Sequence, residues 1–326
     1  MERIIRWGIV GAGNIARKFA RAVKNVEGAE LVAVSSTSAE RGREFAEKFS
    51  IPNIFVGYEE MAKSELVDAV YIATPHPFHK PCSEIFINAG KHVLCEKPIC
   101  VNAREAEELF AKAEEKRVFL MEALWTRFLP AINEARRVAD SGEIGEIRGV
   151  SADFCYSLMP EEEPKIYQNE MAGGSLLDVG IYGLNLASVF LGTNPESITA
   201  VATLGHGVDC HTSVILKYKG GEIASVSSAI NTLKPEVAYI YGSRGYITIP
   251  HFFGAHEFSV STGNNERRVE KASIGEGFEE EIYEACRCIR EGKIHSDVMP
   301  PSESIAILKQ MDCIREEVGL RYPFDK

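Results

Sequence analysis

The sequence predicts an α/β protein in which an N-terminal domain with a doubly wound parallel sheet precedes a C-terminal α+β domain with a large, mostly antiparallel open sheet. Over residues 1–122, strands that are apolar along their whole length alternate with helical stretches, which is typical of a parallel sheet covered on both faces. Over residues 123–326, longer strands alternate polar and apolar residues, and short turns such as "KGGE" and "GSRG" join them. Such turns indicate antiparallel hairpins.

The individual elements follow from this periodicity. In the N-terminal domain we expect strands at 3–10, 29–36, 67–74, 91–97 and 118–124, and helices at 14–26, 39–50, 79–90 and 102–117. In the C-terminal domain we expect helices at 129–145, 173–192, 277–293 and 302–318, strands at 147–157, 197–205, 210–218, 221–230 and 256–262, and a hairpin at 236–250.

Composition excludes several classes of protein. A net charge of −11 without a basic stripe argues against a nucleic-acid partner. Apolar stretches are broken within about ten residues, short of the ~20 that a membrane-spanning helix needs. The N-terminus is already a strand and a turn, so we expect no signal peptide. The eight cysteines form no CxxC and no metal-type cluster with histidine, so we expect reduced thiols, a cytoplasmic protein and no metal site.

A glycine-rich turn follows the first strand. In "GIVGAGNIARKFA", Gly11, Gly13 and Ala16 form a G-x-G-x-x-A pattern that opens a helix at Asn14 and Ile15. The first glycine permits a tight turn, the second lets a pyrophosphate approach the backbone, and the alanine allows close packing of helix and strand. The helix N-terminus adds N–H donors for an anion. The turn therefore predicts a bound dinucleotide.

The end of the second strand bears on the choice between NAD and NADP. NAD sites usually offer an acidic residue there for the ribose 2′-hydroxyl. This chain has hydroxyl residues followed by arginines: Ser35, Ser36, Thr37, Ser38, Arg41 and Arg43. Hydroxyls and a guanidinium suit a 2′-phosphate, so we predict NADP, with NAD as the alternative. A solvated position on the following helix is the alternative interpretation of Arg41.

Two further strands end in polar motifs. The strand at 67–74 runs into "TPHPFH", and we expect Thr74, Pro75, His76 and His79 to face the cofactor, because ligands bind at the carboxyl ends of parallel strands. Capping or packing is the alternative role for both histidines.

The next strand ends in "CEKP", which places Glu96 and Lys97 at the same edge. A lysine there stabilises a developing alkoxide, and Pro98 restricts the backbone that aims it. Glu96 either orients the lysine or contacts the ribose, and we place it among the cofactor residues.

In the C-terminal domain, "GGSLLDVGIYGLNL" places Asp178 and Tyr182 four residues apart, on one face of a helix. A buried structural pair is one interpretation. The glycine-rich entry before them favours the other, a cleft.

The motifs "GIVGAGNIA", "TPHPFH", "CEKP" and "GGSLLDVGIYGL", in this order and at these distances, resemble the glucose–fructose oxidoreductase/inositol dehydrogenase/MocA (Gfo/Idh/MocA) family over nearly the whole chain. The stretch "MEALWTRFLPA", residues 121–131, is similar to the branch that holds dimeric dihydrodiol dehydrogenase and NADP-dependent D-xylose dehydrogenase. The resemblance implies a Rossmann domain at 1–122 and a substrate-binding domain at 123–326, whose open sheet commonly forms a homodimer.

The resemblance also implies roles for single residues. It implies that Lys97 is the catalytic lysine beside the nicotinamide. It also implies that Tyr182 is the acid/base, at a position where many members have histidine. Asp178 is then a residue that contacts or orients the substrate, and the branch's preference agrees with NADP. The residues implied on the substrate side are Trp125, Arg127, Phe128, Phe154 and Tyr156.

Together these features predict an NAD(P)-dependent dehydrogenase or reductase that transfers a hydride between nicotinamide and a CH–OH carbon of a sugar, polyol or vicinal diol. In this mechanism Tyr182 takes the hydroxyl proton while Lys97 stabilises the oxyanion. One alternative is a redox-neutral glycosidase that uses bound NAD transiently. The other is a cofactor-binding regulator without activity.

Overall fold

The computed structural model describes residues 3–325, and the chain divides into two compact units. Unit 1 consists of the chain up to Cys100, Arg104–Trp125 and Ile274–Ser304. Unit 2 consists of Val101–Ala103, Thr126–Ser273 and the chain from Ile305 on. The predicted boundary at 122/123 thus lies near the observed division after Trp125, but the structure returns residues 274–304 to unit 1.

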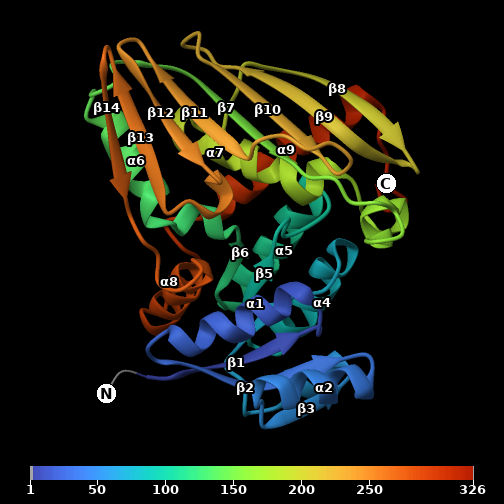
Figure 1. Cartoon of the computed structure of the whole chain (residues 1–326). Coiled ribbons are helices and arrows are strands. Elements are labelled where there is room, and N and C mark those ends of the chain that lie inside the picture. The colour runs from blue at the N-terminus through green and yellow to red at the C-terminus, as the bar shows by residue number, and fades with distance from the viewer. Residues whose placement is uncertain (1–2, 326) are drawn as a thin grey trace. The chain divides into compact units, whose positions relative to one another are not determined.

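Unit 1 is a parallel sheet with helices on both faces, as predicted (Figure 1). Its described strands run in the order β3-β2-β1-β4-β5-β6, which is the doubly wound order of dinucleotide-binding domains. The strands are β1 (Ile5–Val10), β2 (Ala29–Ser36), β3 (Asn53–Val56), β4 (Ala69–Ile72), β5 (His92–Glu96) and β6 (Leu120–Ala123). The helices are α1 (Asn14–Ala22), α2 (Ala39–Phe49), α3 (Tyr58–Lys63), α4 (His79–Asn88), α5 (Ala103–Lys116) and α8 (Phe278–Arg290).

Helix α8 joins unit 1 because its buried face fits the N-terminal elements. The indole N–H of Trp7 on β1 donates to the thiol of Cys286, at 3.4 Å. Arg290 at the end of α8 donates to the carbonyls of Arg3 and Gly28, at 3.0 and 2.9 Å. These contacts join residues more than 260 positions apart, so strand and helix periodicity alone does not reveal them.

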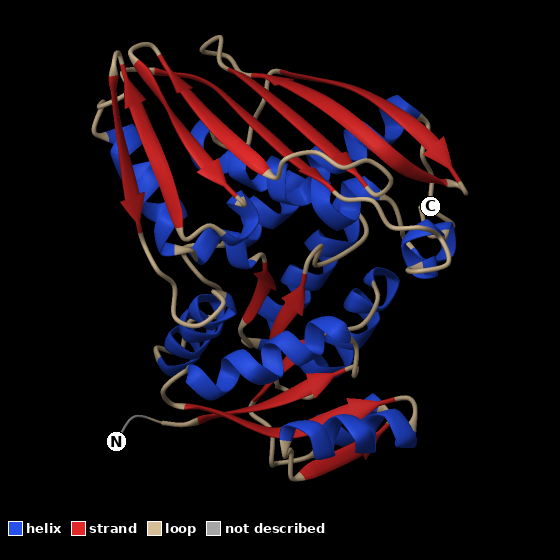
Figure 2. Cartoon of the chain, in the orientation of Figure 1, coloured by secondary structure: helices blue, strands red, loops and turns tan. Residues whose placement is uncertain are grey.

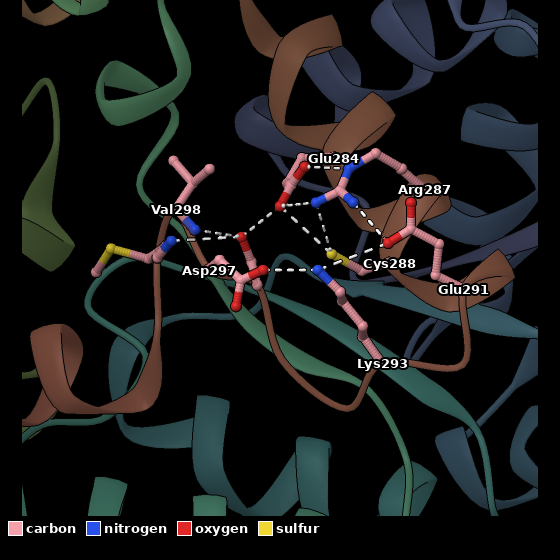
Figure 3. Close-up of polar contacts among 9 residues, drawn as sticks. Glu284, Arg287, Cys288, Glu291, Lys293, Asp297 and Val298 are labelled. Carbon is pink, nitrogen blue, oxygen red and sulfur yellow. Dashed lines mark hydrogen bonds and ion pairs between the residues drawn. The ribbon is translucent and has the colours of Figure 1, made fainter.

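The segment that follows α8 covers the edge strand β6. Figure 3 shows Arg287 between Glu284 and Glu291, and Lys293 beside Asp297. Buried Ser296 donates to Glu284 at 2.5 Å, and its hydroxyl oxygen accepts from the backbone N–H groups of Val298 and Met299.

This network folds the chain back so that the N–H of Leu120 on β6 donates to the carbonyl of Ile294, at 3.0 Å. A donor of the edge strand is thereby satisfied within the chain, which protects the edge against further strand pairing.

Unit 2 is a mostly antiparallel sheet with its helices gathered on one face (Figure 2). Its described strands run in the order β14-β13-β12-β11-β7-β10-β9-β8, and only the β7–β10 pair among them is parallel. The strands are β7 (Ile147–Cys155), β8 (Ser197–Gly205), β9 (Val208–Lys217), β10 (Ile223–Ala229), β11 (Val237–Gly242), β12 (Gly245–Pro250), β13 (Glu257–Thr262) and β14 (Asn265–Glu270). The helices are α6 (Pro130–Asp140), α7 (Ile181–Leu191) and most of α9 (Pro301–Val318).

Helix α7 is preceded by a π-helical turn, Leu176–Gly180, and both are packed against β7 and β10. The whole stretch Asn169–Leu191 is long and apolar enough to cross a membrane, contrary to the expectation from the broken apolar runs, but 83% of its most apolar window is buried within the protein. Such burial is the ordinary reason for an apolar helix in a protein core.

Two strands and one α-helix of the described residues were absent from the sequence prediction. The edge strand β3 alternates half-buried and exposed residues, so it lacks the fully buried run that revealed the equally short β4 and β6. Helix α3 has only six residues, too few to show a clear period. Strand β14, "NERRVE", is an edge strand of the unit 2 sheet and is almost entirely exposed and polar, so it lacks the apolar alternation on which strand prediction rests. All eight cysteines are free thiols; seven are buried and Cys313 is exposed.

Candidate functional site

The glycine turn after β1 has the geometry that a dinucleotide requires. Gly11 has φ +97°, and a Cβ there would lie 2.9 Å from the carbonyl oxygen of Ala73, so only glycine fits. A Cβ on Gly13 would meet open space instead, which leaves room for a pyrophosphate. Gly13 is also the N-cap of α1 and has no side chain to cover the helix N–H groups at Asn14.

The turn lies at a switch point of the sheet. Strand β1 pairs with β2 on one side and with β4 on the other, so the chain crosses the sheet in opposite directions from β1. Ligands of such sheets bind outside the carboxyl ends of the strands at this point. Ala16 is fully buried, as expected for close packing of α1 on the sheet, while Ile15 is half-buried.

The hydroxyl residues at the end of β2 separate into two groups. Ser35 is buried and donates to the carbonyl of Gly57 at 2.7 Å, and the buried Ser36 hydroxyl accepts from the N–H of Ser38 at 3.2 Å. Thr37 is exposed, and the Arg41 guanidinium lies 3.4 Å from its hydroxyl oxygen. Thr37 and Arg41 are therefore the pair available to a 2′-phosphate, whereas Ser35 and Ser36 shape the loop beneath.

The loop after β4 contains two histidines with different surroundings. His76 is half-buried, and its ring lies 5.7 Å from that of His79. His79 is buried, with Nδ1 2.7 Å from the carbonyl oxygen of Pro98 and Nε2 2.7 Å from that of Thr74. Burial lowers the pKa of His79 to about 4. Both ring nitrogens of His79 face backbone carbonyls, so neither is available to a cofactor. Pro75 and His76 are half-buried and keep part of their surface exposed.

Glu96 ends β5 as a buried carboxylate beneath the loop that carries Lys97. Its Oε1 accepts from the Tyr71 hydroxyl, and its Oε2 accepts from the N–H of Lys97 at 3.1 Å. Burial raises the pKa of Glu96 to about 7, against the opposing effects of the Tyr71 hydrogen bond and the Lys97 charge. Glu96 therefore holds the Lys97 backbone, one of the two roles that the sequence left open. The Lys97–Pro98 peptide bond is cis.

A second buried acid, Glu281 on α8, lies near Glu96. Its side chain is fully buried, and burial together with the charge of Glu96 raises its pKa well above the usual carboxyl range. Sequence reasoning missed it because "EEE" at residues 279–281 has the form of ordinary acids in a helix's first turn.

In unit 2, Asp178 and Tyr182 lie beside three other aromatic residues. The Tyr156 hydroxyl donates to Asp178 Oδ2 at 2.6 Å, and burial and the Asp178 charge raise the pKa of Tyr156. The Tyr182 ring is 5.4 Å from Phe154 and 6.1 Å from Phe253. Phe253 stacks on Phe154 at 4.1 Å, and sequence reasoning missed it because it lies in a three-residue 3₁₀ turn between β12 and β13.

The segment "WTRF" contributes to both units. Trp125 belongs to unit 1 and stacks on Phe278 of α8 at 4.6 Å. In unit 2, Arg127 donates to Asn185 at 2.9 Å and to Ser188 at 3.1 Å, both on α7. Phe128 is buried in the same unit. Arg127 therefore braces the helix that carries Tyr182.

Asp209 anchors the start of that helix and was also missed. Its buried Oδ2 accepts from the Ser175 hydroxyl at 2.7 Å, the Leu176 N–H at 2.8 Å and the Thr212 hydroxyl at 2.7 Å. A Cβ on Gly174, which has φ +108°, would lie 2.1 Å from Asp209 Oδ1. The glycine pair of "GGSLLD" thus makes room for this carboxylate, and the remote "VDC" stretch gave no sequence signal for it.

The predicted cofactor residues all belong to unit 1, while Asp178 and Tyr182 belong to unit 2. Residues 5–124 match the oxidoreductase family with an NAD-binding Rossmann fold, and residues 132–248 match the Gfo/Idh/MocA C-terminal domain. The chain belongs to the Gfo/Idh/MocA family. This confirms the resemblance and the fold class inferred from the sequence.

Relatives of this family member include named enzymes. The trans-1,2-dihydrobenzene-1,2-diol dehydrogenases of Mus musculus and Homo sapiens are 39% and 35% identical to it, over 99% of each chain. Among solved structures, the 3-ketoreductase KijD10 of Actinomadura kijaniata in complex with NADP and TDP-benzene has a TM-score of 0.89 at 26% identity, and the match covers 97% of this chain and 98% of that one. The aldose-aldose oxidoreductase of Caulobacter crescentus shares the fold, with a TM-score of 0.89 at 23% identity.

Proposed function

We propose that this Gfo/Idh/MocA oxidoreductase transfers a hydride between NADP and a CH–OH carbon of a sugar, polyol or vicinal diol, with Lys97 and Tyr182 as its catalytic residues. The observation that carries the proposal lies in unit 1. Gly11 follows β1, Thr74 follows β4 and Lys97 follows β5, and these three strands are adjacent and parallel. The carboxyl ends of these strands lie at the same end of the sheet, so Lys97 lies at the end where a cofactor of this fold binds.

NADP is supported by the end of β2. Thr37 and Arg41 together present a hydroxyl and a guanidinium, which form strong charge-assisted hydrogen bonds with a phosphate. The family relative KijD10 is solved with NADP. NAD is the alternative, and a direct comparison of KM for the two cofactors decides between them.

When bound, the oxidised cofactor would accept the hydride during alcohol oxidation, and the reduced cofactor would donate it during carbonyl reduction. During alcohol oxidation the Tyr182 phenolate takes the hydroxyl proton, and during reduction its hydroxyl returns that proton. The Lys97 ammonium stabilises the oxyanion that develops on the substrate oxygen. Asp178, which accepts from Tyr156, orients a substrate hydroxyl, and Phe154 and Phe253 provide an apolar wall.

The relatives support these roles and two classes of substrate. Variants of KijD10 with a tyrosine changed to phenylalanine and a lysine changed to alanine are among the similar structures. KijD10 is named a 3-ketoreductase, and the mammalian relatives are named for a dihydrodiol. Sugars and vicinal diols are therefore the substrates to test.

We further propose a cytoplasmic homodimer that pairs through the open face of the unit 2 sheet. Strand register places five exposed apolar side chains on one face of this sheet, each between 43% and 68% exposed. They are Val201, Ile215, Ile223, Tyr241 and Tyr246. An apolar patch of this kind marks an interaction surface. Light scattering is expected to give twice the chain mass, and the mass of one chain would contradict the dimer.

The function is tested by a substrate panel with the purified protein. We expect NADP-dependent absorbance changes at 340 nm with one or more vicinal diols, aldoses or polyols. Hydrolysis of glycosides without added cofactor would support the redox-neutral alternative. NADP binding without turnover of any substrate in the panel would support a regulator.

A further inference from the structure

The loop that carries Lys97 is held by three buried side chains from three different elements. Glu96, at the end of β5, accepts from the N–H of Lys97 at 3.1 Å. His79, on α4, meets the carbonyl oxygen of Pro98 at 2.7 Å. Glu122, on β6, accepts from the N–H of Ile99 at 2.9 Å. Three successive residues of the loop are thus each fixed by a side chain.

The histidine contact differs from the other two because it allows two arrangements. Both neighbours of the ring are carbonyl oxygens, which only accept hydrogen bonds. Burial, reinforced by the charge of Lys97, lowers the pKa of His79 to about 4, so the ring is neutral at pH 7 and carries one N–H. Only one of the two carbonyls therefore receives a hydrogen bond.

The surrounding backbone indicates which carbonyl receives it. The loop around Thr74 has its own anchors: the N–H of Ala73 donates to Val10 and the N–H of Phe78 donates to Pro75, both at 2.9 Å. At the Lys97 loop, the N–H of Lys97 is donated to a side chain, and Pro98 has no N–H to donate. The ring proton consequently contributes more at Pro98 than at Thr74.

We propose that His79 is a positioning residue for Lys97, which it holds by donating Nδ1–H to the carbonyl of Pro98. This inference rests on the proposed function, because it assigns His79 an effect on turnover through Lys97. It replaces direct cofactor contact as the role of His79. Nε2 is then unprotonated and makes no hydrogen bond to the carbonyl oxygen of Thr74.

Two amide variants separate the two contacts. In His79→Asn the amide NH₂ lies near the position of Nδ1, and in His79→Gln it lies near that of Nε2. We expect His79→Asn to keep kcat within about threefold of the unchanged enzyme and His79→Gln to lower kcat by ~10-fold or more, since small displacements of a catalytic group cost turnover steeply. KM for NADP should change little in both, and His256→Gln, at an exposed histidine of unit 2, is the matched control.

A double-mutant cycle with Lys97→Ala tests whether the effect passes through the lysine. We expect His79→Gln to lower kcat no further when Lys97 is already alanine. Equal losses in the two amide variants, or an undiminished loss in the Lys97→Ala background, would overturn the inference. Unchanged turnover in Lys97→Ala alone would instead refute the proposed function, so the two failures are distinct.

The ring proton is also observable in the unchanged protein, which covers the case in which a variant does not fold. With ¹⁵N-labelled histidine, NMR is expected to show a proton on Nδ1 of His79. A bare Nδ1 would overturn the inference.

Discussion

Replacing Glu96 by glutamine should stabilise unit 1 at neutral pH and remove part of the pH dependence of its stability. Glu96 is buried, accepts from Tyr71 and from the N–H of Lys97, and has its pKa raised by burial to about 7, compared with 4.5 for an ordinary glutamate. Between these two values the folded state holds a proton that the unfolded chain has released. Stability therefore falls as pH rises from about 4.5 to about 7 and levels off above that range.

The size of the effect follows from the same two values. At about 1.4 kcal/mol for each tenfold change, the difference corresponds to about 3 kcal/mol of stability lost across this window. Glutamine cannot ionise, so the loss disappears. It offers one acceptor oxygen in place of two, however, which costs about 1 kcal/mol in lost hydrogen bonding. We therefore expect Glu96→Gln to be more stable than the unchanged protein by about 2 kcal/mol at pH 8 and less stable by about 1 kcal/mol at pH 4.5, where only the hydrogen-bonding cost remains.

Urea denaturation at several pH values measures this directly. Both tryptophans of the chain, Trp7 and Trp125, belong to unit 1, so their fluorescence reports the unit that contains Glu96. Glu114→Gln, at an exposed position on α5, is the control and should leave the pH profile unchanged. If Glu96→Gln parallels the unchanged protein from pH 4.5 to 8, the carboxyl does not titrate in this window and the reasoning fails.

Three further changes test other parts of the molecule. Arg41→Ala should raise KM for NADP by ~10-fold and leave KM for NAD unchanged, because a charged hydrogen bond to phosphate contributes about 1.5–3 kcal/mol. Steady-state kinetics with both cofactors measures this, with Arg21→Ala at an exposed position as the control. Equal increases in KM for NADP and NAD would contradict the prediction. Asp209→Ala should destabilise unit 2 by about 3 kcal/mol, since three buried donors lose their acceptor, whereas Asp209→Asn should destabilise it less. Circular dichroism in urea measures the stability of both variants. Equal losses of stability would show that the carboxylate oxygen is not the anchor. Ser296→Ala should lower the stability of unit 1 by about 2 kcal/mol, because buried Glu284 loses its hydroxyl donor. Tryptophan fluorescence in urea measures this, and an unchanged unfolding midpoint would contradict the prediction.

The sequence predicted those parts of the fold in which local periodicity and burial agree. Strands such as β1 and β4 are buried along their length, so their apolar runs were visible. Strand β14 is polar because it is an exposed edge, and β3, although as short as β4, is only partly buried. The return of α8 to unit 1 depends on contacts such as Trp7 with Cys286, which are remote along the chain.

The same division applies to the candidate site. Gly11, Gly13, Lys97 and Asp178 are in compact motifs, so the sequence alone singled them out. The structure gives Gly11 and Gly13 the backbone geometry of a tight turn with open space above it, and the roles of Lys97 and Asp178 are proposals. Asp209, Glu281 and Phe253 act through neighbours that are distant in sequence, and their own surroundings contain no motif. His79 was found from its motif, and packing was one of the two roles left open for it. The sequence could not show its two contacts, because both are with backbone carbonyls at 2.7 Å and carbonyl positions leave no trace in side-chain identity.

The central claim is that Lys97 and Tyr182 perform the chemistry rather than bind the cofactor. Single-turnover hydride transfer, measured with Tyr182→Phe and Lys97→Ala on a substrate of the unchanged enzyme, tests it most directly. We predict a rate at least ~100-fold lower in each variant, the lower range for general acid–base catalysis, with the Kd for NADP nearly unchanged. Hydride transfer at the normal rate in Tyr182→Phe would contradict the account.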